Sequence, residues 1–114
     1  MKDTLLSLIL EAVEEKKAIN PVILNLKGIS NVTDYFLICS GKTAIQVRSI
    51  VDNIIDKIME TEVRIPLKEG YHEGHWILLD FGNVVVHIMQ ETDRDFYALE
   101  NLWHDAEVLI DKRV

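Results

Sequence analysis

The residues of this 114-residue chain that could do chemistry are few and lie far apart. Gly41-Lys42-Thr43 has the last letters of the phosphate-binding P-loop, and it stands between an apolar stretch and a helical one. The complete motif also needs a glycine five residues before Gly41, where this chain has Phe36. We therefore interpret the three residues as a turn and a helix cap, although a helix N-terminus can attract an anion.

The acids and histidines do not indicate a catalytic or metal site. Asp80-Phe81-Gly82 copies the metal-binding tripeptide of kinases without the lysine strand and catalytic loop that accompany it. His72 and His75 have no third ligand nearby, and a glycine between them breaks any helix. Asp80 and His87 could share a hydrogen bond, but a catalytic dyad also needs a nucleophile or second carboxylate. We expect no catalytic residue, no cofactor and no metal.

Composition restricts the partners and the compartment. The single cysteine, Cys39, lies in an apolar run and is expected to be a buried, reduced thiol, which indicates a cytoplasmic location. A net charge of -7 argues against wrapping nucleic acid, so we expect little direct nucleic-acid contact and a basic protein partner instead. No apolar run approaches the roughly 20 residues that span a bilayer, so we expect no membrane contact.

The element that must position the candidate residues is a predicted β-hairpin over residues 74–90. Its two apolar runs flank Gly82-Asn83, a pair that tolerates positive φ and suits the tight primed turns of hairpins. With this turn, Phe81 pairs with Val84, and one face of the hairpin becomes wholly apolar. We expect this face to be core: Ile77, Leu79, Phe81, Val84, Val86 and Ile88.

The other hairpin face mixes large apolar side chains with one acid and one imidazole. It collects Trp76, Leu78, Asp80, Val85, His87 and Met89. Two interpretations stay open: a surface for a protein partner, because Trp and Met are enriched at interfaces, or a face covered by a second helical layer of the same domain. We select five candidate partner-binding residues from it: Trp76, Leu78, Asp80, His87 and Met89.

The rest of the chain alternates helices and strands. Helices are predicted at about 4–17, after Asp3 or Thr4 as cap, at 43–60, after Thr43, and at 93–110. Strands are predicted at 22–26, 35–39 and 63–67, the last at a sheet edge because it contains a proline, before a polar loop at 68–74. The pattern predicts one α/β (α+β) domain over residues 1–114, with a mixed sheet of about five strands, flanking helices and a fraying tail at 103–114.

Three stretches occur in a characteristic order over residues 32–103: DYFLICSG, QVRSIVDNI and GHWILLDFGNVVVHIMQETDRDFYALENLW. The most specific parts are the tryptophan six residues before a glycine turn, the run Val84-Val85-Val86-His87, and the ending Tyr97-x-Leu99-Glu100-x-Leu102-Trp103. Together they resemble the ribosomal silencing factor family, also called RsfS or Iojap-related. Two departures are Asn83, where many members have Asp, and the turn after Gly41, which is often richer in Ser and Thr.

The resemblance implies a non-enzymatic factor whose fold is similar to nucleotidyltransferases. It implies binding to the large ribosomal subunit through its universal protein numbered fourteen, which is basic, a block on joining of the small subunit, repression of translation and a link to ribosome biogenesis. The alternative is a nucleotidyltransferase-like enzyme using Asp80 and a metal, but no second acid stands two residues away. A homodimer of the free protein, with the mixed faces packed together, is a third hypothesis that can coexist with the first.

Overall fold

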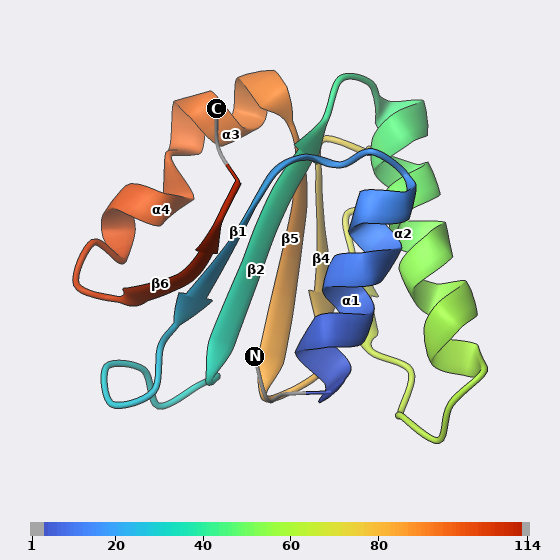
Figure 1. Cartoon of the computed structure of the whole chain (residues 1–114). Coiled ribbons are helices and arrows are strands. Elements are labelled where there is room, and N and C mark those ends of the chain that lie inside the picture. Colours follow the sequence, from blue (N-terminus) through green and yellow to red (C-terminus); the bar gives the residue numbers. More distant parts are fainter. Residues whose placement is uncertain (1–3, 113–114) are drawn as a thin grey trace.

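A computed structural model describes residues 4–112, and its centre is a six-stranded sheet (Figure 1). The strand order is β3-β4-β5-β2-β1-β6. Figure 1 shows α1 and α2 on one side of the sheet and α3 and α4 on the other. The elements are α1 (Thr4–Glu15), β1 (Ile19–Asn25), β2 (Tyr35–Gly41), α2 (Ala44–Met59), β3 (Leu67–Glu69), β4 (Trp76–Asp80), β5 (Val84–Gln90), α3 (Glu91–Tyr97), α4 (Leu99–Leu102) and β6 (Glu107–Asp111).

The predicted hairpin and its register are confirmed. Asp80 pairs with Val85 in β4 and β5, and the Phe81 amide donates to the Val84 carbonyl at 2.9 Å across the turn. Gly82 has φ +90, the conformation that a primed turn requires at its first central residue and that glycine adopts without strain. β5 continues as the parallel partner of β2, while the other strand pairs are antiparallel, so the sheet is mixed as expected.

The first face of the sheet, defined as the side that carries Leu79, is the aliphatic core predicted from alternation. Phe81 at the hairpin end is partly buried, and the five other predicted core residues are buried. α1 and α2 contribute further apolar side chains to this core, with α1 packed against α2. The helices supply mainly Leu6, Ile9, Val13, Val47, Ile50, Val51, Ile54 and Ile58.

The Gly41-Lys42-Thr43 segment is a turn followed by a helix cap, as interpreted. Thr43 has an extended backbone, and its hydroxyl accepts a hydrogen bond from the Gln46 amide at 3.1 Å. The Gln46 side-chain oxygen accepts in turn from the Lys42 amide at 2.8 Å. The Thr43 hydroxyl therefore satisfies one amide that the helix N-terminus leaves without an intrahelical partner, and the Gln46 side chain satisfies the Lys42 amide just before the cap.

Several predicted boundaries move in the structure. Thr4 lies inside α1 and is not its cap, and Asp3 lies outside the described residues. β1 begins before the predicted strand and includes Pro21. The strand predicted at 63–67 is displaced: β3 begins at Leu67, directly after Pro66, and runs into the predicted polar loop, because a proline cannot donate a ladder hydrogen bond. Its expected place at the sheet edge is confirmed.

The largest correction concerns the C-terminal part of the chain. The single helix predicted over 93–110 breaks at Ala98, which has φ +46, and the chain then forms β6 antiparallel to β1. The Asn25 side-chain amide also donates to the Glu107 carboxylate at 3.1 Å. The sheet thus has six strands where about five were expected. The tail that was expected to fray from Trp103 contains β6 in the described part of the chain, because the open edge of β1 supplies backbone partners for it.

No helix within residues 4–112 is both long and apolar enough to cross a membrane.

Candidate partner-binding surface

The second face of the sheet, on the side opposite Leu79, is partly covered and partly open. Leu99 of α4 and Ala106, just before β6, pack on apolar side chains of β1 and β2. Towards the edge formed by β3 and β4 the cover is incomplete, and Leu78 is half-buried. Leu67 pairs with Asp80 and so lies on the same face, where it is 72% exposed. The interpretation of a covered face is thus confirmed for the part over β1 and β2. For the part along β4, the partner surface stays a prediction.

The five candidate residues divide between surface and interior. Trp76, Leu78 and Asp80, all on β4, are half-buried and reach the surface. His87 is 4% exposed and Met89 is 0% exposed, so neither offers a side chain to a partner in this conformation. The reason is their strand: β5 lies between β4 and β2 in the sheet, whereas β4 has only the three-residue strand β3 beyond it.

Asp80 and His87 do not form the hydrogen bond that their spacing allowed. The Asp80 carboxylate accepts from the Gly82 amide at 2.7 Å and so helps to close the hairpin turn. His87 lies diagonally from it, because His87 pairs with Leu78. The pair therefore does not act as an acid–base unit in this structure. Within the described residues, no group of three or more His, Cys, Asp or Glu side chains is close enough to hold a metal.

His87 has another partner, the indole of Trp76. The Trp76 Nε1–H donates to His87 Nδ1 at 3.1 Å across the β4–β5 pair. The centres of the two rings are 5.8 Å apart, and the ring of Phe36 stands edge-on to the imidazole at 4.5 Å. Burial lowers the pKa of His87 to about 4, so the imidazole is neutral at physiological pH.

A row of aromatic side chains continues from Trp76 over the second face, and we call it the aromatic row. Tyr97 lies against Trp76 at 5.1 Å between ring centres, and Phe96 lies against Tyr97 at 5.1 Å. Phe36 contacts Trp103 at 5.8 Å at the opposite end. Phe96 is 81% exposed, so this end of the row is open to a partner. The row consists of Phe96, Tyr97, Trp76, His87, Phe36 and Trp103.

Sequence reasoning missed the contribution of Phe36, Phe96 and Tyr97 to this surface. A usable signal was Phe36, which is an aromatic residue in a strand otherwise made mostly of small and aliphatic side chains. For Phe96 and Tyr97 the sequence held no comparable signal, because their direction depends on where the helix breaks. A continuous helix would have turned them by a different angle relative to the sheet.

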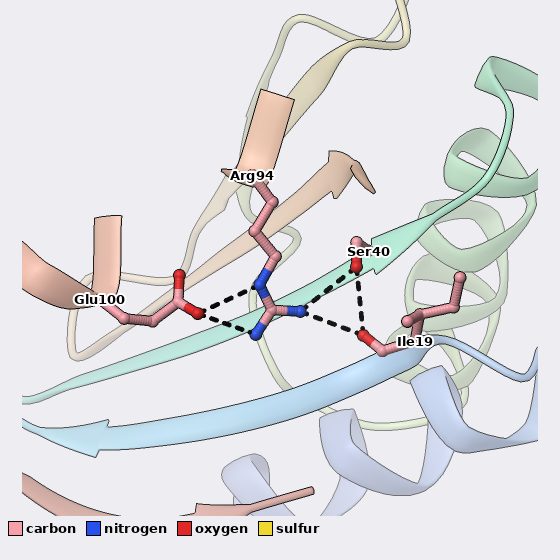
Figure 2. A network of polar contacts seen from close by, with 4 residues as sticks. All are labelled: Ile19, Ser40, Arg94 and Glu100. Carbon is pink, nitrogen blue, oxygen red and sulfur yellow. Dashed lines mark hydrogen bonds and ion pairs between the residues drawn. The ribbon is translucent and has the colours of Figure 1, made fainter. Parts of the chain in front are cut away.

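The break between α3 and α4 is held in place by one buried arginine (Figure 2). Arg94 is 7% exposed, and its Nε and Nη2 donate to Glu100 Oε2 at 3.2 and 3.1 Å. Its Nη1 donates to the Ile19 carbonyl at 3.1 Å and to the Ser40 hydroxyl at 3.3 Å. One guanidinium thus ties both short helices to β1 and β2, which fixes the end of the aromatic row that α3 carries.

The charged side chains exposed around α3 and α4 are acidic. Glu91 and Asp95 of α3 are exposed, as are Asp105 and Glu107 before and in β6. The arginine of this segment is buried and paired with Glu100. An open aromatic surface bordered by carboxylates favours a partner that carries basic side chains.

Cys39 takes no part in this surface. Its side chain is buried in the first-face core, as expected, and burial raises the pKa of the thiol to about 12. A thiol that stays protonated at neutral pH is a poor nucleophile. Cys39 therefore acts as a small apolar core residue.

Several relatives of this chain share one name. Residues 1–114 match the family described as ribosomal silencing factor during starvation. A ribosomal silencing factor from Halalkalibacterium halodurans is 44% identical over 102 residues, which is 90% of this chain and 87% of that protein. The Bacillus subtilis factor is 40% identical over 103 residues, with 90% and 87% covered. A mouse protein named mitochondrial assembly of ribosomal large subunit protein 1 is 34% identical over 74 residues, 62% of this chain and 32% of its own.

Solved structures agree with the fold described above. A crystal structure of a Chromobacterium violaceum protein superposes with a TM-score of 0.84 at 31% identity, covering 88% of this chain and 83% of that chain. A crystal structure from Bacillus halodurans superposes with a TM-score of 0.82 at 40% identity, covering 93% and 96%. With the full length of the chain matched and 87% of both bacterial factors covered, this protein belongs to the ribosomal silencing factor family.

Proposed function

We propose that this protein binds the large ribosomal subunit through its universal protein numbered fourteen, blocks joining of the small subunit and thereby represses translation. The observation that carries the proposal is the open half of the second face, where the Trp76 side of the aromatic row lies beside Leu78 and an acidic border. Family membership supplies the ribosome, and the resemblance described at the outset supplies the particular ribosomal protein.

The proposed contact surface consists of the residues that reach solvent. Trp76, Leu78 and Asp80 touch the partner directly, and Tyr97 and Phe96 extend the surface along α3. Aromatic side chains bury a large area and have few rotatable bonds, so fixing them costs little conformational entropy. Such residues often carry much of the binding energy of an interface. His87 and Met89 stay in the proposed site as support beneath the contact residues.

Charge supports a basic protein as the partner. The chain has a formal net charge of -7, and the exposed carboxylates of α3, Glu91 and Asp95, belong to the same short helix as Phe96 and Tyr97 of the proposed surface. Complementary charge speeds the association of two proteins and excludes partners of like charge. The same charge opposes extensive contact with ribosomal RNA, so we propose little direct nucleic-acid contact. Separately, the buried free thiol of Cys39 supports our proposal of a cytoplasmic location.

The decisive experiment is sedimentation of tagged protein with isolated large subunits and, separately, with complete ribosomes. A factor at the joining surface must compete with the small subunit, so we expect recovery with isolated large subunits and little with complete ribosomes. Adding the protein before small subunits should lower the yield of complete ribosomes. Equal recovery with both particles would remove the blocking mechanism.

A catalytic function is tested separately. We propose that the protein neither binds nucleoside triphosphates tightly nor transfers nucleotides, because Asp80 serves the hairpin turn. Calorimetry with ATP and magnesium should show no micromolar binding. If it does, Asp80→Asn is the informative variant, since the amide oxygen can still accept from the Gly82 amide while the negative charge is lost. Binding abolished by that variant would favour the enzyme.

We also propose that the free protein can form a homodimer through the open half of the second face. Two such faces would cover one another's apolar side chains when no ribosome is present. Sedimentation equilibrium should then show self-association that Leu78→Glu abolishes. Dimerisation that survives this substitution would place the contact elsewhere on the protein.

A further inference from the structure

A hydrogen bond beneath the proposed contact surface assigns a role to a residue that the partner does not touch. His87 is 4% exposed and lies in the middle of β5, between Ile38 of β2 and Leu78 of β4. Its side chain cannot meet a partner, yet it carries the acceptor for the one polar atom of the Trp76 indole. The two residues belong to different strands, so the bond joins the interior of the sheet to its surface.

Donor chemistry determines the state of the imidazole. An indole N–H can only donate, and it donates to His87 Nδ1 at 3.1 Å. Nδ1 must therefore hold a lone pair, so the ring proton of the neutral imidazole is on Nε2. His87 Nε2 is buried without a hydrogen-bond partner in the described part of the chain. The hydrogen bond that the His87 side chain makes in the described part of the chain is therefore the one at Nδ1.

Ring contacts restrict the same geometry from two sides. Phe36 stands edge-on to the imidazole at 4.5 Å and at an interplanar angle of 70°, which limits rotation of the His87 ring. Tyr97 lies at 5.1 Å from the Trp76 indole, on the α3 side. The indole thus lies between Tyr97 and His87 in an orientation that satisfies its N–H. A half-buried tryptophan without that acceptor would lose either the hydrogen bond or its orientation.

We propose that His87 is a positioning residue that holds the Trp76 indole in the orientation required for partner binding. The inference rests on the proposed function for its biological meaning, because Trp76 is the aromatic contact residue there. Its physical content is independent of the ribosome: Nδ1 of a neutral, Nε2-protonated His87 accepts the Trp76 N–H in the free protein.

The first test uses nitrogen-15 NMR of the free protein to measure the indole signal of Trp76 and the protonation of the His87 ring nitrogens. The chain has two tryptophans, and Trp76→Phe identifies the indole signal of Trp76 by its loss. We expect long-range histidine spectra to show a protonated Nε2 and an unprotonated Nδ1 at His87. His87→Leu should shift the Trp76 indole signal and speed its exchange with water, while the Trp103 signal stays. A protonated Nδ1, or an unchanged indole signal in His87→Leu, would overturn the proposal.

The second test uses a conservative rescue. In His87→Asn the side-chain oxygen occupies nearly the place of Nδ1 and can accept the same hydrogen bond. We expect His87→Leu to weaken binding to isolated large subunits about fivefold, the worth of one net hydrogen bond, and His87→Asn to restore most of it. Circular dichroism and thermal unfolding establish that both variants fold. Should Asn bind as weakly as Leu while folding normally, His87 would not act through its acceptor.

A double-mutant cycle separates positioning from a general structural role. Trp76→Phe keeps an aromatic ring but removes the N–H, so adding His87→Leu to it should change affinity less than about twofold. An undiminished loss in that background would overturn the inference. If Trp76→Ala itself leaves binding unchanged, the proposed contact surface is wrong. If Trp76→Ala weakens binding and His87→Leu does not, only the role of His87 is wrong.

Discussion

The two faces of the sheet are built from different kinds of side chain. The first face is aliphatic and lies under α1 and α2, and its contacts are non-directional. The second face carries the aromatic row, which includes a neutral histidine, and a buried arginine paired with Glu100. It is covered over β1, β2 and β5 and open along β4. Two pairs of these groups meet at specific atoms, the Trp76 indole with His87 and the Arg94 guanidinium with Glu100.

Under the proposed function, the difference separates stability from recognition within the same strands. β4 alternates between the two roles: Ile77 and Leu79 point into the first-face core, while Trp76, Leu78 and Asp80 point to the second face. Aliphatic burial stabilises the fold without determining a surface geometry. Aromatic rings with polar atoms require defined partners, and those partners determine what the surface presents.

The largest expected effect belongs to the first face. Leu79→Ala removes a fully buried side chain and should lower the free energy of unfolding by about 2–5 kcal/mol. Urea unfolding followed by circular dichroism measures it. The folded fraction should bind large subunits with unchanged affinity, because Leu79 faces away from the proposed surface. A small loss of stability would mean that the core relaxes into the cavity.

The second prediction, with a somewhat smaller effect, concerns the pH dependence of the free energy of unfolding that the buried His87 causes. Burial lowers the pKa of His87 to about 4, below its unfolded value of about 6.5, so the unfolded state binds the extra proton between these values. This contribution to stability is complete above pH 6.5 and is lost as the pH falls towards 4. It amounts to about 3 kcal/mol, since one pKa unit is about 1.4 kcal/mol.

Urea unfolding of wild type and His87→Asn at a series of pH values isolates that contribution, because the carboxylates titrate in both proteins. The wild type should lose more stability than the variant between pH 6.5 and 4. Parallel curves of unfolding free energy against pH would show that His87 is not buried in its neutral form. The second face would then lack one of the buried polar groups that distinguish it from the first.

The third prediction concerns the exposed edge of the aromatic row. Trp76→Ala should weaken binding to isolated large subunits by about 2 kcal/mol or more. Its effect on unfolding should be smaller than that of Leu79→Ala, because the indole is half-buried. Ile45→Ala is the matched control, since Ile45 is 78% exposed on α2, far from the second face, and should change neither quantity.

Should Trp76→Ala unfold the domain as readily as Leu79→Ala, the second face would be a second core rather than a recognition surface. The partner would then bind elsewhere, and the separation of roles along β4 would not hold.

The smallest expected effect lies at the break between α3 and α4. Ala98 has φ +46, a conformation that costs an L-residue roughly 1 kcal/mol and glycine almost nothing. Ala98→Gly should therefore stabilise the protein by about 0.5–1 kcal/mol in urea unfolding. Ala12→Gly, inside α1, should destabilise it by about 1 kcal/mol or more. Equal losses at both sites would show that the left-handed residue is not strained.

The features that could be predicted from the sequence are those that residues close together in the chain determine. The hairpin register followed from Gly82 and from alternation, and Thr43 was recognisable as a cap because its partner Gln46 lies three residues away. The first-face core followed from the same alternation. These features depend on residues that are neighbours in sequence.

The missed features depend on distant partners. Residues 107–111 continue a helical spacing of apolar side chains, and only the open edge of β1 makes them a strand. The break at Ala98 has no glycine to indicate it, and it depends on Arg94 reaching Ile19 and Ser40. Whether the second face was open or covered could not be read from the hairpin alone, because α4 and Ala106 decide it.

The pairing of β6 with β1 has a consequence for the order of folding. Asn25 and Glu107, which meet in this pair, are 82 positions apart along the chain. Closing so long a loop is entropically unfavourable, and contacts between distant residues slow folding. The strands β1 to β5 join residues up to Gln90, so a five-stranded intermediate can form first, with the sixth strand added to its edge last. During that interval the edge of β1 is unpaired, and it can then pair with the same edge of a second folding chain.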